Sequence, residues 1–266
     1  MSEHISLMEL QQLSIGYAEG KKEPLFRNIS AHISQGMLIA LFGPNGIGKS
    51  TLLKTMAGLQ PPMGGAALLL GKELRRWPPV EIAGQISFVP SHLLRTHRLS
   101  VADMVGIGRY GFTNRMGTER ESDREAIAKA LKATSLTSLA QRDSSTLSDG
   151  ELQRASIARS LSQDTPLIFF DEPTAFLDTG NKFKIAYLLK ELTKTANKGI
   201  VFSTHDLTLA LQVCDVLWMM TGHGFYAEPP CQLIQKGILD TLFSSYGLVF
   251  DRNILGYRFT PPSSCE

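Results

Sequence analysis

The nine residues Gly43-Pro-Asn-Gly-Ile-Gly-Lys-Ser-Thr51 constrain this chain more than any other stretch. They match the pattern G-x-x-x-x-G-K-[ST], and they lie between an apolar run at 37–42 that predicts a strand and a segment that predicts a helix. The glycines let the backbone curl so that successive N–H groups point at one anion. A helix that opens at Lys49 adds the positive end of its dipole. These flanks disfavour the alternative, an accidental match in a glycine-rich turn.

This phosphate loop predicts a binding site for a nucleoside triphosphate with Mg²⁺. Lys49 can reach the β- and γ-phosphates, and the Ser50 hydroxyl is placed to hold the metal. The residues that we expect to bind the triphosphate are Gly43, Pro44, Asn45, Gly46, Ile47, Gly48, Lys49, Ser50 and Thr51.

Length and composition fit one large globular domain. The chain has 266 residues, 43% of them hydrophobic and 20% charged. A formal net charge of +2 gives no electrostatic reason to expect nucleic acid as the partner. Three scattered cysteines indicate a reducing compartment rather than a disulfide framework. Because no apolar run approaches the ~18 residues of a membrane span and the N-terminus lacks a secretory signal layout, we expect a cytoplasmic protein that can dock on a membrane protein.

Alternating strand and helix patterns around the loop predict a parallel α/β sheet. The run 166–170 is apolar throughout, as expected of a strand that is buried on both faces. A helix with an apolar stripe from Ile185 to Leu192 is expected to stop at Gly199. Further strands are expected within 5–42 and at 66–70, 86–89, 200–203 and 216–220, the last of which closes the sheet.

Residues 91–162 contain helical patterns without β alternation, which predicts a helical insertion between two halves of the sheet core. The sequence from Ser122 to Glu125 reads as a capping box for one of these helices. We therefore expect one domain with three parts. These are a sheet core with an N-terminal β part (1–90 and 163–222), a helical subdomain (91–162) and a C-terminal extension (223–266).

Polar residues follow two of the predicted strands and suit the chemistry of a bound triphosphate. Asp171 comes directly after the apolar strand and can supply the carboxylate that Mg²⁺ requires. Glu172 follows at once and can polarise a water, although two acids before a proline also suit a turn or helix cap. His205 follows the strand 200–203, where it can hydrogen-bond a γ-phosphate, although a lone histidine is more often structural.

The sequence Leu147-Ser-Asp-Gly-Glu151 heads another predicted helix and has the make-up of a second phosphate-binding helix end. From the residues alone an ordinary N-cap is the preferred interpretation, because one chain needs one phosphate loop. A second phosphate-binding site, or phosphate cradle, would have a function if two copies met head to tail. Each copy would then offer this helix end to the nucleotide that the other copy binds.

Taken together, the motifs resemble those of the ATPase subunits of ATP-binding cassette (ABC) transporters. The likeness runs from Tyr17 to Asp215 and includes the phosphate loop, LSDGE at 147–151, LIFFDEPTAFLD at 167–178 and STHD at 203–206. LSDGE is similar to the family signature LSGGQ, which is highly specific. The resemblance implies a P-loop NTPase fold with a RecA-like parallel sheet core, an N-terminal antiparallel β subdomain and an inserted helical subdomain.

The resemblance also implies roles for single residues. Tyr17 would stack on adenine, Glu172 would be the general base and His205 the switch histidine, with Lys49 assisting catalysis. Two copies would bury two ATP molecules between them, and their opening and closing would drive polytopic membrane permease subunits docked on the helical insertion. The residues that would reach the partner copy or its ATP are Ser148, Gly150, Glu151 and Asp178.

Two residues depart from the family pattern. Ser91 stands where the family usually has a Gln that touches Mg²⁺ and water. Its shorter side chain can act there through a bridging water. Asp149 replaces the first glycine of the signature and adds negative charge near a phosphate. We expect working but slow hydrolysis.

The segment from Leu99 to Tyr110 resembles importers of iron-siderophores, haem and cobalamin, although Gly111 stands where these usually have Pro. Asp171 to Asp178 resembles their DEPTAHLD, with Phe176 in place of His. The first hypothesis is therefore the ATPase of such an importer, peripheral on the cytoplasmic face of the membrane. Two others stay open: a soluble ABC ATPase in a process such as iron–sulfur assembly, and a nucleotide-gated structural subunit that barely hydrolyses ATP.

Overall fold

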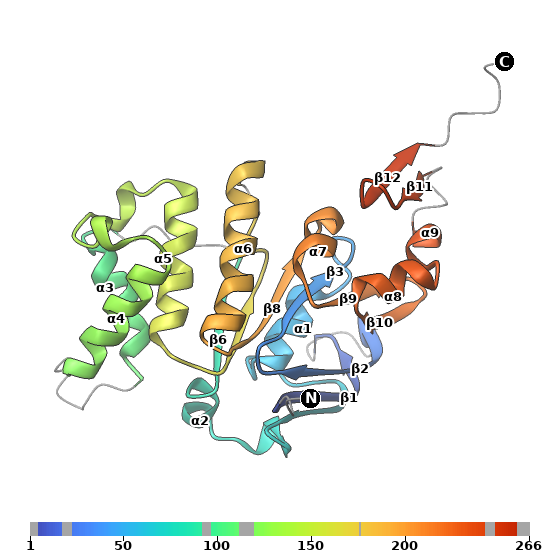
Figure 1. Ribbon diagram of the computed structural model, residues 1–266. Helices are drawn as coiled ribbons and strands as arrows, with labels where there is room; N and C mark the ends of the chain where they lie inside the picture. The colour runs from blue at the N-terminus through green and yellow to red at the C-terminus, as the bar shows by residue number, and fades with distance from the viewer. Residues whose placement is uncertain are drawn as a thin grey trace.

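A six-stranded sheet forms the centre of the computed structural model (Figure 1), which describes residues 5–17, 23–91, 97–111, 120–175, 177–242 and 248–259. Its strand order is β10-β9-β3-β8-β7-β6. Every neighbouring pair is parallel except β9 and β10, which are antiparallel. The strands span Leu38–Phe42 (β3), Ile86–Val89 (β6), Leu167–Phe170 (β7), Gly199–Thr204 (β8), Val216–Thr221 (β9) and Gly224–Glu228 (β10). The predicted parallel α/β sheet is confirmed.

The strands β3, β7 and β8 are buried along their whole length because both faces of this sheet are covered. One set of alternating side chains, including Leu38 and Ala40, packs against α6 and α7. The other set, including Ile39 and Leu41, packs against α1 and a second sheet. The covering helices span Lys49–Met56 (α1), Thr179–Thr195 (α6) and Leu207–Val213 (α7).

The second sheet is antiparallel and four-stranded, with the order β2-β1-β4-β5. Its buried side chains, such as Leu13 and Ile29, come from strands that alternate between apolar and polar residues. Two short helices connect it to β6. The elements span Ser6–Ile15 (β1), Phe26–Ser34 (β2), Gly64–Leu69 (β4), Lys72–Glu73 (β5), Leu74–Arg76 (η1) and Pro79–Ala83 (α2).

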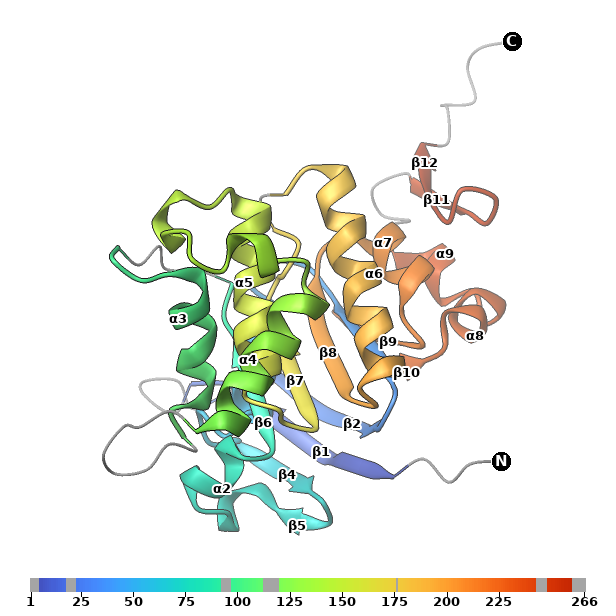
Figure 2. The same ribbon diagram turned by 60° about the vertical axis from the view of Figure 1, so that its left-hand side comes forward.

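The segment between β6 and β7 is helical in its described parts, as predicted. Figure 2 shows α3, α4 and α5 packed together beside the sheet, and their apolar faces form a separate core that includes Ile127, Ala130 and Leu131. The elements span Val101–Gly106 (α3), Ile107–Arg109 (η2), Glu121–Ala133 (α4), Thr137–Leu139 (η3), Ser144–Thr146 (η4) and Asp149–Ser162 (α5).

Two helix boundaries differ from the prediction. The helix α4 begins at Glu121, so the predicted cap Ser122 lies inside it and Asp123, rather than Glu125, occupies the third helical position. The Asp123 carboxylate accepts a hydrogen bond from the backbone N–H of Arg120 at 3.1 Å. The helix α6 ends at Thr195, four residues before Gly199, which instead begins β8. The apolar stripe ends at Leu192, so burial does not extend the helix further.

The prediction that residues 216–220 close the sheet is wrong, because β10 pairs with β9 and forms the edge. After β10 the chain forms Pro230–Gln235 (α8) and Ile238–Leu242 (α9), then a hairpin of Leu248–Asp251 (β11) and Gly256–Phe259 (β12). In Figure 1 this hairpin lies at the opposite end of the molecule from α3 and α4. None of the helices in the described ranges has the length and apolar character to cross a membrane.

Candidate active site

Three neighbouring strands bring the predicted site residues to one edge of the central sheet. The strand β8 lies between β3 and β7, with Phe42 opposite Thr204 and Phe170 opposite Phe202. The phosphate loop follows β3, the two acids follow β7, and His205 follows β8. Because parallel strands end at the same edge, residues far apart in the sequence meet there.

The phosphate loop has the backbone conformation that its glycines permit. Gly46 and Gly48 have φ values of +80° and +113°, in the region that residues with a Cβ rarely adopt. Gly48 is also the N-cap residue of α1, and its carbonyl oxygen accepts from the N–H of Leu52 at 2.8 Å. The loop therefore leads directly into a helix N-terminus, where free N–H groups favour an anion.

Lys49 is 5% exposed, and its ammonium group is held inside the loop. Its Nζ donates to the carbonyl oxygens of Gly43 at 2.8 Å and Pro44 at 3.2 Å. It also lies 3.8 Å from Oε1 of Glu172. Burial lowers the pKa of Lys49, and the carboxylates of Glu172 and Asp171 oppose this shift. A phosphate beside Nζ would favour the charged form in the same way as these carboxylates do.

Ser50 and Asp171 bring together a hydroxyl and a carboxylate, which are oxygen groups of the kind that Mg²⁺ prefers. The Ser50 hydroxyl donates to Oδ1 of Asp171 at 2.9 Å, across a sequence separation of 121 residues. Asp171 is 5% exposed and lies just beyond the end of β7. Mg²⁺ in phosphate-transfer sites is typically held by one or two protein carboxylates together with phosphate oxygens, and the buried Asp171 beside the half-buried Ser50 fits that arrangement.

The Glu172 carboxylate lies between two nitrogen-bearing side chains. Its Oε1 faces Nζ of Lys49, and its Oε2 is 3.9 Å from Nδ1 of His205. Glu172 has a φ of +49°, which is uncommon for a residue with a side chain. This turn breaks the strand alternation that would send the side chains of Asp171 and Glu172 to opposite faces, so both acids belong to one cluster.

Tyr17 lies beside the start of α1. The Thr51 hydroxyl donates to the Tyr17 hydroxyl at 3.4 Å, and the tyrosine is 55% exposed. An exposed aromatic ring anchored next to a phosphate loop is available for stacking on a base.

The predicted second phosphate cradle forms a capping box at the start of α5. The Ser148 hydroxyl accepts from the N–H of Glu151 at 3.3 Å, and the Glu151 carboxylate accepts from the N–H of Ser148 at 2.8 Å. Asp178 likewise caps α6 by accepting from the N–H of Asn181 at 2.9 Å. A Cβ on Gly150 would lie 3.5 Å from Cγ of Asn181, so the two helix ends are neighbours.

The structure thus joins the predicted residues into two groups. In the first group, Glu172 contacts Lys49 and His205, Asp171 contacts Ser50, and the two acids are consecutive in the chain. The second group, at the starts of α5 and α6, contains Ser148, Gly150, Glu151 and Asp178.

A further residue, Ser203, contacts the first group, and the sequence analysis gave it no role of its own. The Ser203 hydroxyl donates to Oδ1 of Asp171 at 2.8 Å and accepts from the N–H of Glu172 at 2.8 Å. The available signal was a hydroxyl near the end of an otherwise apolar strand, two residues before His205.

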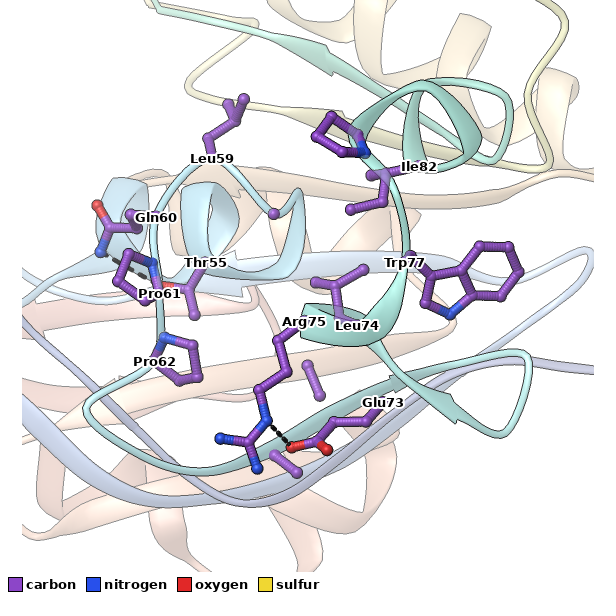
Figure 3. A pocket seen from close by; sticks show the side chains of 14 residues that line it. Thr55, Leu59, Gln60, Pro61, Pro62, Glu73, Leu74, Arg75, Trp77 and Ile82 are labelled. Carbon is purple, nitrogen blue, oxygen red and sulfur yellow. Dashed lines mark hydrogen bonds and ion pairs between the residues drawn. The ribbon is translucent and has the colours of Figure 1, made fainter.

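A separate hollow of about 390 Å³ lies where the α1–β4 connection meets η1 and α2. Figure 3 shows Leu59, Leu74, Trp77 and Ile82 around it, with Arg75 and Glu73 paired at its side. None of the predicted site residues lines this pocket. Because it shares no residue with the cluster at the sheet edge, this pocket is distinct from the candidate active site.

Comparisons with known proteins agree with this geometry. The family model described as "ABC transporter" matches residues 26–175, which is more than half of the chain. The chain belongs to the ABC transporter family.

Several relatives of this ABC protein are named as ATP-binding proteins of transport systems. It is 35% identical over 241 residues to the "Probable siderophore transport system ATP-binding protein YusV" of Bacillus subtilis, a match that covers 90% of this chain and 86% of the relative. It is 30% identical to the "Ferric enterobactin transport ATP-binding protein FepC" of Escherichia coli, over 98% of this chain and 96% of the relative. The solved structure of cbiO1 from Clostridium perfringens, part of the ABC transporter complex cbiONQ, superimposes with a TM-score of 0.75 at 25% identity, covering 90% of this chain and 95% of that one.

The ABC protein is therefore an ATP-binding subunit with ATPase activity, and its fold is the P-loop NTPase fold predicted from the motifs. The cbiO1 protein is itself described as part of a transporter complex.

Proposed function

We propose that this ABC ATPase powers an importer for iron-siderophore, haem or cobalamin-type cargo from the cytoplasmic face of the membrane. The names of the relatives for siderophore and ferric enterobactin transport support this cargo class. The resemblance of residues 99–110 to importers of this group agrees with it.

The observation that carries the catalytic part of the proposal is the position of the Glu172 carboxylate. One of its oxygens lies 3.8 Å from Nζ of Lys49, and the other lies 3.9 Å from Nδ1 of His205. It is also 26% exposed, so water can reach it. A carboxylate next to the phosphate-binding lysine and open to water is suited to act as a general base.

Each residue of this cluster has its own role in ATP hydrolysis. Glu172 accepts a proton from a water whose oxygen attacks the γ-phosphorus, and the bond from that phosphorus to the β–γ bridging oxygen breaks. Lys49 balances the negative charge of the phosphates, and His205 donates a hydrogen bond to the γ-phosphate. Ser50 and Asp171 would hold Mg²⁺, and that ion would neutralise charge on the phosphate oxygens.

Nucleotide binding uses both groups of residues. The loop 43–51 binds the triphosphate, and Tyr17 stacks on adenine. We further propose a head-to-tail homodimer in which Ser148, Gly150 and Glu151 reach the ATP of the partner copy and Asp178 lies at the interface. The exposure of Ser148 and Asp178 at neighbouring helix ends supports this arrangement, because both are accessible to a second molecule. The sheet core, helical subdomain and C-terminal extension, as divided above, form the three parts of each copy.

The proposal is tested by ATP turnover of the subunit assembled with its permease in proteoliposomes. Glu172→Gln is expected to lower turnover by about 100-fold or more, the usual contribution of a general base. Nucleotide binding should persist, because the phosphate loop is intact. Glu125→Gln, an exposed residue on α4, is the matched control and should hydrolyse ATP normally. Unchanged turnover in Glu172→Gln would show that another group is the base.

A transport assay distinguishes an importer ATPase from a soluble ABC ATPase. Proteoliposomes that hold the permease and its binding protein should accumulate a ferric siderophore only with ATP on the side of this subunit. Failure to associate with any permease encoded beside it, combined with full ATPase activity alone, would favour the non-transport alternative.

A further inference from the structure

Ser203 occupies a central place in the core of the sheet. It is the fifth residue of β8, opposite Leu41 of β3, and it is fully buried. The three residues before it are the apolar Ile200, Val201 and Phe202, so its hydroxyl is the first polar side-chain group along this stretch of the strand. A buried hydroxyl requires hydrogen-bond partners, and both of its partners belong to the candidate site.

The hydroxyl uses its donor and an acceptor position at once. It donates to Oδ1 of Asp171 at 2.8 Å and accepts from the backbone N–H of Glu172 at 2.8 Å. The same hydroxyl therefore contacts the side chain of the residue proposed to hold Mg²⁺ and the backbone of the residue proposed as base.

The contact with Asp171 gives this carboxylate a second hydroxyl donor. Oδ1 of Asp171 accepts from Ser50 at 2.9 Å and from Ser203 at 2.8 Å. One donor lies on α1 and the other on β8, so the carboxylate is held between two separate elements. Two donors on one oxygen restrict rotation of the carboxylate, which favours a single orientation toward the phosphate loop.

The contact with Glu172 acts on a backbone conformation that needs support. Glu172 has a φ of +49°, and its own carbonyl oxygen accepts from the N–H of Ala175 at 3.1 Å. With Ser203 bound to its N–H, both backbone groups of Glu172 are paired. Such a conformation persists when the surrounding structure fixes it, and here it turns the Glu172 carboxylate toward Lys49 and His205.

We propose that Ser203 is a positioning residue for ATP hydrolysis, whose hydroxyl holds the Asp171 carboxylate and the Glu172 backbone in the geometry that the reaction uses. The proposal rests on the function proposed above for Asp171 and Glu172. Ser203 itself does not contact substrate; it acts through its two neighbours.

Ser203→Ala in the permease-assembled subunit tests this role. The variant loses both hydrogen bonds, so we expect kcat for ATP hydrolysis to fall about 10- to 100-fold, with a similar rise in the Mg²⁺ concentration needed for half-maximal rate. Affinity for ATP measured in EDTA should stay within about twofold of wild type, because the phosphate loop is untouched. Ser203→Cys places a larger thiol, a weak donor and acceptor, at the same position, and kcat should fall there as well.

Ser87→Ala is the matched control. Ser87 is 1% exposed on β6, and its hydroxyl bonds to that of Thr165 at 2.7 Å and to the Ser160 carbonyl oxygen at 3.3 Å, away from the site. Removing this hydroxyl tests the effect of losing a buried hydrogen bond of the same sheet, and it should leave kcat and the Mg²⁺ requirement unchanged.

The outcomes distinguish the proposed role of Ser203 from the proposed role of Glu172 as general base. Wild-type kcat and Mg²⁺ dependence in Ser203→Ala, together with inactive Glu172→Gln, would overturn the role of Ser203 and leave the proposed base intact. The same loss in Ser87→Ala as in Ser203→Ala would also overturn it, because the effect would then be one of stability. Full turnover in both Glu172→Gln and Ser203→Ala would overturn both proposals.

Discussion

A Cβ placed on Gly108 would lie 2.3 Å from the carbonyl oxygen of Arg159 and equally close to Oγ of Ser162. The η2 turn therefore packs directly on the last turns of α5. The Gly-Arg pair at 108–109, which resembles a feature of siderophore-type importers, thus has a structural role inside the helical segment. Its glycine permits the close approach, and Arg109 donates to the Ser162 carbonyl oxygen at 3.0 Å.

Gly108→Ala should destabilise the protein by about 1–3 kcal/mol, because the methyl group meets backbone that cannot give way easily. Urea unfolding monitored by circular dichroism measures this. Gly111→Ala is the control, since no atom of the described residues lies within 4 Å of the position of its Cβ. Equal stability of the two variants would mean that η2 can move away from α5 without loss.

The ion pair between Arg109 and Asp123 makes the stability of the helical segment dependent on pH. Nε of Arg109 donates to Oδ1 of Asp123 at 2.8 Å, and Asp123 is 1% exposed. This bond and the one from the Arg120 N–H hold the pKa of Asp123 below its ordinary value. The folded state therefore favours the ionised form. Its stabilising effect is complete above the ordinary aspartate pKa of about 3.9 and is lost as the pH falls through the lower folded value.

Asp123→Asn should consequently be less stable than wild type at pH 7, and the difference should narrow as the pH falls below about 4. The free energy of unfolding, measured in urea across this pH range, gives the comparison. Glu125→Gln on the same helix is exposed and should leave the pH dependence as it is. A difference between wild type and Asp123→Asn that is constant with pH would contradict the ion-pair explanation.

The sequence predicted correctly those helices and strands whose position depends on one local pattern of residues. The strands β6, β7 and β8 were predicted to within one residue at each end, because each contains a short run of mostly apolar and buried residues. The first group of site residues could also be expected to meet, since they follow parallel strands. The boundaries of α4 were harder to predict, because Asp123 takes a partner, Arg109, that lies 14 positions away.

Other features depend on contacts that no local pattern carries. Ser203 was missed because its importance comes from pairing across the sheet, where β8 places it beside the residues that follow β7. Residues beyond 222 gave little signal, although β10 extends the sheet by pairing with β9. The division into subdomains, the site roles and the role of Ser91, which lies two residues beyond the end of β6, stay predictions for experiment.

The cysteines should differ strongly in reactivity. Cys214 is buried at the end of α7, and burial raises its thiol pKa to about 12, so almost no reactive thiolate forms at neutral pH. Cys231 on α8 is exposed. In a Cys265→Ser background, a maleimide should modify Cys231 and leave Cys214 untouched until urea is added. Labelling of Cys214 in the native protein would show that α7 opens at its C-terminal end.

A comparison of two serines with the same local geometry can distinguish a role in helix capping from a role in nucleotide binding. Ser100 caps α3 with Asp103, and Ser148 caps α5 with Glu151, each in a reciprocal capping box. Replacing either serine by alanine should cost about 1 kcal/mol of stability. Only Ser148, however, belongs to the signature-like helix end proposed to reach the ATP of a partner copy.

Ser100→Ala and Ser148→Ala, each combined with Glu172→Gln to prevent hydrolysis, should therefore unfold at similar urea concentrations but differ in self-association. With ATP and Mg²⁺, sedimentation velocity should show a dimer for Ser100→Ala and at least tenfold weaker dimerisation for Ser148→Ala, since a charge-assisted hydrogen bond is worth about 1.5–3 kcal/mol. Because the capping loss is common to both variants, the difference between them reports the contact across the interface. Identical dimerisation of the two would limit Ser148 to its observed role as an N-cap and remove the reason for a second phosphate cradle.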